Sequence, residues 1–354
     1  MPRSSTRRAS HAGSWYTSDG RKLDHQLETW LKATDAPKEG DPLPHPPTKG
    51  CKAIIGPHAG YSYSGPAAAF AYRCIDVDAI KRVFVLGPSH HVYLDGCALS
   101  KCKEYETPVG NLPLDLDTIA ELKATGRFEE MDLATDEDEH SLEMHLPYIR
   151  KVFEGRDIKV VPILVGSIST ASEKSFGALL APYLADPATL FVISSDFCHW
   201  GSRFRYTHYH PPTSSDPTAG KALTAGNFAQ TVPDGEAWRG IERLDKLGME
   251  TIAFSLAPSS TRNGGNNPAT EDDKPPSAAH DQFAAYLKAT RNTICGRHPI
   301  GVLLGALSAL EHDEAWVRSG VRCEWVRYEQ SSRVRNVGDS SVSYASAFVA
   351  VGEA

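Results

Sequence analysis

The chain of 354 residues has no apolar run near the roughly 18 residues that a membrane-spanning helix needs, and its first residues lack the apolar core of a secretory signal. It also lacks a basic face. The formal net charge is -7, and Lys and Arg are scattered apart from Arg3, Arg7, Arg8 and the run 327–335. These absences argue against a membrane-spanning protein and against one that binds nucleic acid. We therefore expect a protein of the cytoplasm, with the nucleus as a second location.

Compact signatures of metal binding and catalysis are missing as well. The sequence contains neither a Cys-x-x-Cys pair nor a His-Glu-x-x-His motif. The segment Gly87-Pro-Ser-His-His lacks the second glycine of a Gly-x-Ser-x-Gly elbow, so a serine nucleophile is not indicated. The cysteine count of 7 is odd, which argues against a disulfide framework and leaves at least one thiol free as a ligand or nucleophile.

What the chain does contain is a regular alternation of buried strands and helices. Apolar residues make up 41% of the sequence, enough for a sizeable core. Repeated β/α alternation predicts an α/β fold with helices on both faces of a sheet. Apolar runs predict strands at 53–56, 83–87, 97–100, 158–165, 190–195, 321–328 and 342–351. Helical spacing of apolar residues predicts helices at 23–31, 66–74, 116–125, 142–149, 173–184 and 300–310.

Three of the predicted strands end in the same kind of segment. An apolar run is followed by Gly-Pro or Ser-Ser, and then by histidine or aspartate. In an open α/β sheet, ligands collect at the carboxyl ends of the strands. We therefore expect these side chains to line one rim of the sheet. They are His58, His90, His91, Asp196 and His199.

Cys295 completes a candidate mononuclear metal site with His58 and His90. Imidazole suits Zn, Fe and Cu, and a thiolate favours Cu(I), Zn or thiolate-tolerant Fe(II). Three ligands leave a position open for substrate or oxygen. Asp196 and His199 could orient a ligand imidazole or exchange protons with a bound substrate. Their i, i+3 spacing would place both on one side of a helical turn.

The same residues allow a different chemistry. Cys295 lies just before the helix predicted at 300–310, where backbone N–H groups and the helix dipole would lower the pKa of its thiol. With His58 or His90 as general base, this thiol could be the nucleophile of a hydrolase that needs no metal.

Other polar residues near these motifs are candidates for the same cleft. His140 and His145 are five residues apart and would not share a helix face, so we expect one in the cleft and the other in a structural role. Cys198 adjoins His199. We interpret the acidic run 136–139 as a solvated loop. The candidate cleft residues are His91, His140, His145, Cys198 and Arg297.

Several segments lack the patterns of regular structure. Stretches rich in Pro, Gly, Ser and Asn are predicted to be flexible loops at 36–50, 211–236 and 258–280. The basic residues 1–9 are expected to fray, and the aromatic segment 10–16 to dock on the body. The cysteines expected as small core residues are Cys51, Cys74, Cys97, Cys102 and Cys323.

Seven motifs together resemble one known family. They are Ser10-His-Ala-Gly-Ser-Trp-Tyr, Pro57-His-Ala-Gly-Tyr, Leu86-Gly-Pro-Ser-His-His, Thr135-Asp-Glu-Asp-Glu-His-Ser-Leu-Glu-Met-His-Leu-Pro, Ser194-Ser-Asp-Phe-Cys-His-Trp-Gly, Asn292-Thr-Ile-Cys-Gly-Arg-His-Pro-Ile-Gly and Asp339-Ser-Ser-Val-Ser-Tyr. The sequence is similar to the Memo family, eukaryotic mediators of receptor-kinase-driven cell motility. The resemblance runs over a single domain at 9–354.

The resemblance implies a fold and a site. The Memo family is structurally related to class III extradiol dioxygenases of the LigB type, which implies an αβα sandwich around a mixed β-sheet. The family's metal site of two histidines and one cysteine carries over onto His58, His90 and Cys295. The cysteine stands where the dioxygenases have a carboxylate, and a soft thiolate changes metal preference, so ring cleavage is not expected. Asp196 and His199 match further cleft residues, with His199 where the dioxygenases keep an acid/base histidine.

For function, the resemblance implies an intracellular redox protein that binds Fe(II) or Cu(I), with Zn as a third choice. The alternative is a non-enzymatic adaptor that binds a phosphotyrosine peptide or a signalling protein in the same cleft. Arg203, Arg205 and Arg297 are the candidate phosphate partners near the motifs.

Overall fold

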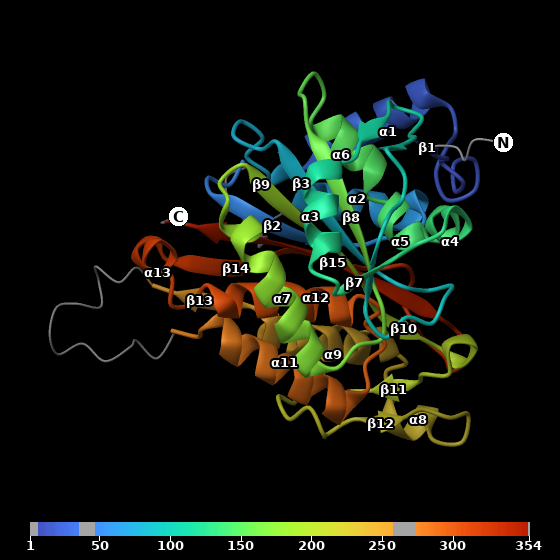
Figure 1. Cartoon of the computed structure of the whole chain (residues 1–354). Coiled ribbons are helices and arrows are strands. Elements are labelled where there is room, and N and C mark those ends of the chain that lie inside the picture. The colour runs from blue at the N-terminus through green and yellow to red at the C-terminus, as the bar shows by residue number, and fades with distance from the viewer. Residues whose placement is uncertain (1–5, 35–46, 258–272, 353–354) are drawn as a thin grey trace, which may run out of the picture.

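The protein is described by a computed structural model over residues 6–34, 47–257 and 273–352. Its core is a mixed sheet of 10 strands with helices packed on both faces (Figure 1). The predicted α/β sandwich is therefore confirmed.

The strands of the large sheet run in an order far from their order in the chain. In space they are β13 (Phe254–Leu256), β14 (Val321–Gln330), β15 (Ser341–Val351), β2 (Cys51–Gly56), β9 (Thr189–Ser194), β3 (Arg82–Pro88), β8 (Lys159–Val165), β4 (Cys97–Leu99) and β7 (Phe128–Glu130), and β10 (Asp196–Trp200) pairs with β15. Two small sheets are made of β1 (Thr6–Arg7), β5 (Glu104–Tyr105) and β6 (Leu112–Pro113), and of β11 (His208–Tyr209) and β12 (Lys221–Ala222).

The centre of the large sheet is parallel. β2, β9, β3 and β8 are parallel neighbours, whereas β15, β14 and β13 continue the sheet antiparallel. Strands covered on both faces need apolar side chains at nearly every position, which explains the continuous apolar runs of the sequence. Because β2, β3 and β9 are parallel, their carboxyl ends meet at one edge, and this edge carries the residues expected to share a rim.

Helices form the outer layers. They are α1 (Gly20–Ala33), α2 (Tyr61–Arg73), α3 (Leu116–Ala124), α4 (Leu133–Asp138), α5 (His140–Glu143), α6 (Leu146–Val152), α7 (Thr170–Ala185), α8 (Phe228–Thr231), α9 (Ala237–Ile252), α11 (Pro276–Thr290), α12 (Arg297–Ala309), α13 (Glu314–Ser319) and the 3-10 turn η1 (Ser202–Phe204). α2 packs on β2, β14 and β15, whereas α7 and α12 pack together against β9 and β3. α11 lies against α9 and α12 on the outside of this second layer (Figure 1).

Capping explains where the clearest helices begin. Asp19 accepts hydrogen bonds from the N–H groups of Arg21 and Lys22 at the start of α1, and Ser169 caps α7 through the N–H of Ser172. The helix predicted from 66 begins earlier, at Tyr61, so Pro66 lies inside α2 rather than in its first turn. Tertiary contacts hold the additional turn, because the Tyr61 hydroxyl donates to the carbonyl of Met144.

The predicted loops differ from expectation where the structure describes them. The segment 211–236 contains β12 and α8 and buries Leu223 and Val232 in the core. Of the segment 258–280, residues 276–280 belong to α11, which corrects that boundary, and 258–272 lie outside the described residues. Most of 36–50 lies outside them as well. The flexibility predicted for these segments stays a prediction.

The amino-terminal segment is packed from residue 6, so the expectation of a frayed segment over 1–9 is wrong for its last residues. Arg7 is fully buried, and its guanidinium contacts Asp136 Oδ1 at 3.1 Å and Glu143 Oε2 at 2.6 Å. Asp136, Glu137 and Glu139 are buried and Asp138 is exposed, so most of the acidic run is buried and paired and is not the solvated loop that we expected. As predicted, Tyr16 docks on the body.

Candidate metal centre

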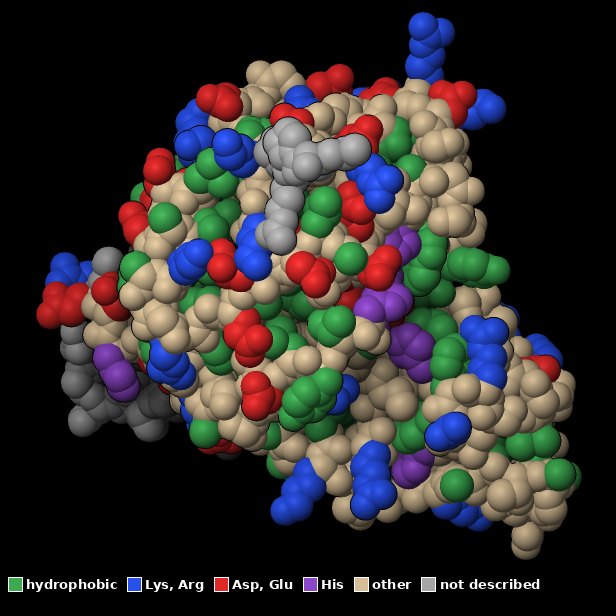
Figure 2. Space-filling view, turned by 45° about the vertical axis from the view of Figure 1, so that its right-hand side comes forward, with side chains coloured by type: hydrophobic (Ala, Val, Ile, Leu, Met, Phe, Trp, Pro, Cys, Tyr) green, Lys and Arg blue, Asp and Glu red, His purple; other side chains and the backbone are tan. Residues whose placement is uncertain are grey.

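Three separate elements bring the predicted metal ligands together. His58 follows β2, His90 follows β3, and Cys295 lies in the loop that precedes α12. One ligand atom from each of the three residues lies within 4.8 Å of the other two. Histidine side chains gather in a hollow on this face of the molecule, with Lys and Arg near its lower end (Figure 2). The expected shared rim is therefore present for these residues.

Hydrogen bonds fix which nitrogen of His58 is free. Its Nδ1 lies 2.6 Å from the Ser194 hydroxyl, and that hydroxyl donates to the carbonyl of Ser141 at 2.7 Å. Because the serine proton is already engaged, Nδ1 of His58 carries the proton and donates. Nε2 of His58 is left with a lone pair, and it faces the Cys295 sulfur at 3.1 Å.

A buried carboxylate, Glu139, fixes which nitrogen of His90 is free. Oε1 of Glu139 accepts from Nδ1 of His90 at 2.9 Å, and Oε2 accepts from the His90 N–H at 2.8 Å. Burial acts to raise the pKa of Glu139, but the hydrogen bonds and charge of His90 prevail and lower it to about 2. Carboxylate–histidine pairs of this kind orient metal-binding imidazoles in proteins, and they leave Nε2 of His90 free as a ligand.

The environment of Cys295 differs from the one that the sequence predicted. Burial and the nearby Asp196 raise the pKa of the Cys295 thiol well above its ordinary value, whereas we expected a lowered one. α12 begins only at Arg297, and the N–H that reaches Sγ comes from Asp196, at 3.2 Å. Burial and the neighbouring histidines, first His90, lower the pKa of His58. Both shifts favour the uncharged form of the side chain. Without a cation, the pair is a neutral thiol beside a neutral imidazole.

Asp196 and His199 lie on β10, so the pair does not share the helical turn that its spacing would allow. Oδ1 of Asp196 accepts from the His58 N–H at 2.8 Å, and burial raises the pKa of Asp196. Nδ1 of His199 faces two carbonyl oxygens, those of Phe197 at 2.9 Å and Thr293 at 3.1 Å. A carbonyl can only accept, so Nδ1 of His199 carries a proton, which leaves Nε2 as the nitrogen that faces no protein acceptor among these contacts.

Of the two histidines in the 140–145 segment, His140 lies at the site. Its ring stacks on His90 with centroids 4.3 Å apart, and it lies tilted against Trp15 with centroids 4.4 Å apart. Burial and the adjacent His90 lower the pKa of His140 to about 3. His91 is exposed at the rim, with its ring edge-on to His140 at 5.8 Å.

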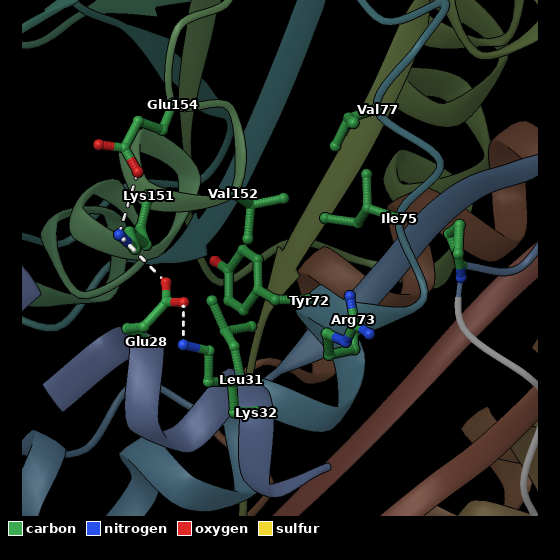
Figure 3. Close-up of a pocket in the computed structure, with 11 residues that line it drawn as sticks. Glu28, Leu31, Lys32, Tyr72, Arg73, Ile75, Val77, Lys151, Val152 and Glu154 are labelled. Carbon is green, nitrogen blue, oxygen red and sulfur yellow. Dashed lines mark hydrogen bonds and ion pairs between the residues drawn. The ribbon is translucent and has the colours of Figure 1, made fainter. Parts of the chain in front are cut away.

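His145 is structural, as one member of the pair was expected to be. The predicted helix over 142–149 is divided into α5 and α6 at this residue, and His145 is buried with Nδ1 2.7 Å from the Tyr72 hydroxyl. Tyr72 also lines a pocket of about 410 Å³ between α1, α2 and α6 (Figure 3). That pocket is lined by ion-paired residues such as Lys151, which contacts Glu28 and Glu154, and among the described residues that line it there is no cysteine or histidine. It is therefore separate from the candidate metal centre.

Two further predicted residues lie at different depths. Cys198 is fully buried beneath the site, and its N–H donates to Oδ1 of Asp245 at 3.2 Å. Arg297 is half-buried as the first residue of α12. The five cysteines expected in the core, namely Cys51, Cys74, Cys97, Cys102 and Cys323, are all buried and free.

Sequence reasoning missed the residues that hold the ligands. Glu139 was part of the acidic run, and Ser194 was noted only as the first residue of a motif. Asp245 lies on α9, for which the sequence analysis made no prediction. Alternating charge and apolar residues over 237–252 give α9 a strongly amphipathic pattern, and that signal could have located the helix.

The fold and the site together define a class. This is an α/β protein with a mixed sheet, in which two imidazoles and one thiol meet at the carboxyl edge of the parallel strands. The sequence model of the family described as "Memo-like protein" matches residues 7–257 and 276–348. The chain belongs to the Memo family.

Relatives share most of the length of the chain. "Protein MEMO1" of Xenopus tropicalis is 45% identical over 349 residues, which cover 98% of this chain and 97% of that protein. "Protein MEMO1" of Homo sapiens is 44% identical over 347 residues, which cover 98% of this chain and 97% of that protein. "Protein memo-1 homolog" of Caenorhabditis elegans is 40% identical over 341 residues, which cover 96% of this chain and 81% of that protein.

A solved structure with a weaker likeness is that of an uncharacterized protein from Escherichia coli K12. It has a TM-score of 0.38 and 14% sequence identity, over 82% of this chain and 98% of that chain. Within the described part of this chain, every helix is too short or too polar to cross a bilayer.

Proposed function

We propose that this protein binds Fe(II) or Cu(I) through His58, His90 and Cys295 and supports redox chemistry with oxygen at that site. One observation carries the proposal. The three ligand atoms lie within 4.8 Å of one another, and both imidazoles have Nδ1 engaged, by Ser194 and by Glu139. The ligands are thus already oriented toward a common point, as the partners of metal-binding histidines arrange them.

The chemistry of the donor set favours a soft or borderline cation. Two neutral imidazoles and one thiolate suit Cu(I), Fe(II) and Zn, and Zn is the third candidate. Burial opposes ionisation of Cys295 and His58 in the absence of a cation. A positive charge between them would reverse this for the thiol, because a coordinated thiol loses its proton. When bound, Fe(II) or Cu(I) would supply electron exchange with oxygen.

A residue beside the ligands would handle protons. Because two carbonyls hold the proton of His199 on Nδ1, Nε2 is the nitrogen through which the ring could exchange a proton with a bound substrate. On the His90 side, the ring of His140 stacks on His90 and Trp15 lies beyond it, while His90 itself stays open to solvent at the rim.

The hydrolase alternative has less support. A nucleophilic cysteine needs an ionised thiol beside a protonated imidazole. The Sγ of Cys295 and Nε2 of His58 have a suitable separation of 3.1 Å, but burial raises the pKa of the thiol and lowers that of the imidazole. Both shifts favour the neutral, unreactive pair.

One observation favours the peptide-binding alternative. The guanidinium of Arg203 lies over the ring of Phe204 at 4.4 Å, and that ring lies edge-on to His199 at 5.3 Å. An exposed cation one ring away from the site could pair with the phosphate of a phosphotyrosine peptide. Peptide affinity that survives the change of His58, His90 and Cys295 to Ala would favour an adaptor without metal chemistry.

We also propose that the protein is located in the cytoplasm or the nucleus.

The direct test is an anaerobic titration of metal-free protein with Fe(II) and with Cu(I). Wild type is compared with Cys295→Ala and with Cys97→Ala, a control in which a buried core thiol of β4 is removed. The proposal predicts tight binding at one equivalent by wild type and by the control, and loss of binding by Cys295→Ala. Binding that is absent from wild type, or equal in all three proteins, would overturn it.

A further inference from the structure

The strand that carries Asp196 and His199 has an extra residue where these two face the site. β10 pairs antiparallel with β15, and Asp196 lies opposite Tyr344 whereas His199 lies opposite Val342. Three steps on β10 therefore span two steps on β15, which is a β-bulge. In a regular strand, residues three apart point to opposite faces, and one additional residue turns them to the same face. The shared orientation of Asp196 and His199 depends on this bulge.

A buried carboxylate from α9 holds the bulge. Asp245 is fully buried, and its Oδ1 accepts the N–H of Cys198, one of the two residues between Asp196 and His199, at 3.2 Å. The same oxygen accepts the side-chain amide of Asn292 at 2.8 Å. One oxygen atom thus joins the bulge of β10 to the loop that leads to Cys295.

The loop and the strand are further connected by short hydrogen bonds. The side-chain oxygen of Asn292 accepts the N–H of Thr293 at 2.8 Å, and the Thr293 hydroxyl accepts the N–H of His199 at 2.7 Å. Sγ of Cys295 accepts the N–H of Asp196 at 3.2 Å. Residues 292–295 are therefore hydrogen-bonded along the bulge, and Asp245 binds both the bulge and the loop.

The other oxygen of Asp245 faces away from the site. Oδ2 accepts the hydroxyl of Tyr328 at 2.9 Å, and the hydroxyl of Ser343 is a further donor to this carboxylate. These donors, like Cys198 N–H and Asn292, are neutral. A carboxylate buried among neutral donors is costly to keep ionised, and residues that are costly to the fold are concentrated at functional sites.

We propose that Asp245 is a positioning residue, which holds the β10 bulge and the 292–295 loop in the single arrangement that brings Asp196, His199 and Cys295 to the site. The inference deepens the proposed function and rests on its choice of site. It assigns to Asp245 no contact with metal or substrate. The role lies in Oδ1 as a hydrogen-bond acceptor, and the negative charge is not required.

Three variants separate the acceptor from the charge and from general packing. Asp245→Asn keeps an oxygen at the position of Oδ1. Asp245→Ser removes that acceptor, whereas Tyr328→Phe removes a hydroxyl that donates to Oδ2 and also contacts Ser343 and Gln330, and it leaves the donors to Oδ1 in place. Two readouts on metal-free protein follow the site: hydrogen–deuterium exchange of the peptide 196–200, and the rate at which iodoacetamide alkylates Cys295, located by mass spectrometry. Cys295 is the partly exposed cysteine and the other six are buried, so alkylation reports on this thiol.

The expected result is specific to the acceptor. Asp245→Ser should raise exchange in 196–200 and change the Cys295 alkylation rate by at least about fivefold, because it leaves buried donors unpaired. Asp245→Asn and Tyr328→Phe should match wild type in both readouts. Wild-type values for Asp245→Ser, or equal changes in Asp245→Ser and Tyr328→Phe, would overturn the proposal.

A fourth variant covers the case in which Asp245→Ser does not fold. Asn292→Ala breaks the connection from the loop side but leaves Cys198 N–H bound to Asp245. It should change the alkylation rate of Cys295 by loosening the loop, and an unchanged alkylation rate would contradict the proposal. None of these measurements uses a metal, so a failure to bind Fe(II) or Cu(I) would count against the proposed function and not against this inference.

Discussion

Sγ of Cys295 lies 3.1 Å from Nε2 of His58, and both groups are held in their neutral forms. Desolvation favours the neutral form of each, so the pair carries no charge. Nδ1 of His58 is engaged by Ser194, which leaves Nε2 and the sulfur as the available donor atoms. A cation placed between them would take the place of the thiol proton.

Metal binding should therefore release protons. Since burial keeps His58 neutral and Cys295 protonated before binding, coordination by the thiolate should release at least about one proton for each metal ion bound. Calorimetric titration of wild type in two buffers of different ionisation enthalpy measures this number. Release of no proton would mean that the thiol is not a ligand.

The carboxylate behind His90 should matter for affinity. Glu139→Gln keeps the shape of the side chain but weakens the acceptor for Nδ1 of His90, so we expect metal affinity to fall by about 10–100-fold. Glu137→Gln is the matched control on the same acidic segment, because Glu137 pairs with Arg8 and not with a ligand. Competition with a chelator of known affinity measures both variants, and equal affinities would show that Glu139 has no influence on the metal.

Asp245 should make stability depend on pH. Burial raises its pKa from 3.8 to about 6, so the stability that it contributes is complete below about 3.8 and is lost as the pH rises through about 6. Relative to Asp245→Asn, wild type should lose up to ~3 kcal/mol of unfolding free energy between pH 4 and pH 8. Urea unfolding of both proteins across this range measures the difference, and a difference that does not vary with pH would refute the prediction.

The buried arginine near the amino terminus should contribute strongly to stability. Arg7→Met removes the cation that pairs with Asp136 and Glu143, and it leaves two carboxylates buried without their partner. We expect a loss of about 3–5 kcal/mol in the free energy of unfolding. Arg8→Met is the control, since its side chain is 76% exposed and its ion pair should contribute less than about 1 kcal/mol. Similar losses in the two variants would contradict this account.

The sequence predicted the elements that depend on local pattern. Continuous apolar runs located β2, β3, β8 and β9, because strands covered on both faces need apolar residues at nearly every position. The histidines after β2 and β3 could be placed on one edge, because the carboxyl ends of parallel strands lie at the same edge of a sheet. The meeting of His58 and His90 therefore followed from strand ends alone.

What the sequence did not predict depends on contacts between distant residues. Residues 136–139 look like a solvated acidic loop until Arg7, about 130 positions away, is placed against them. The bulge in β10 leaves no pattern in its own five residues, because it is set by pairing with β15 and by Asp245. The raised pKa of Cys295 likewise depends on burial and on the nearby Asp196, and the spacing of residues along the chain reveals neither.

The most direct test of the proposed site is X-ray absorption spectroscopy of the anaerobic Fe(II)-loaded protein, measured beside the Cys295→Ala variant. Our account predicts a metal shell with one sulfur and imidazole nitrogens in wild type, and loss of the sulfur contribution in the variant. A wild-type shell of nitrogen and oxygen only, or a sulfur contribution that survives the loss of Cys295, would contradict the two-histidine, one-cysteine site.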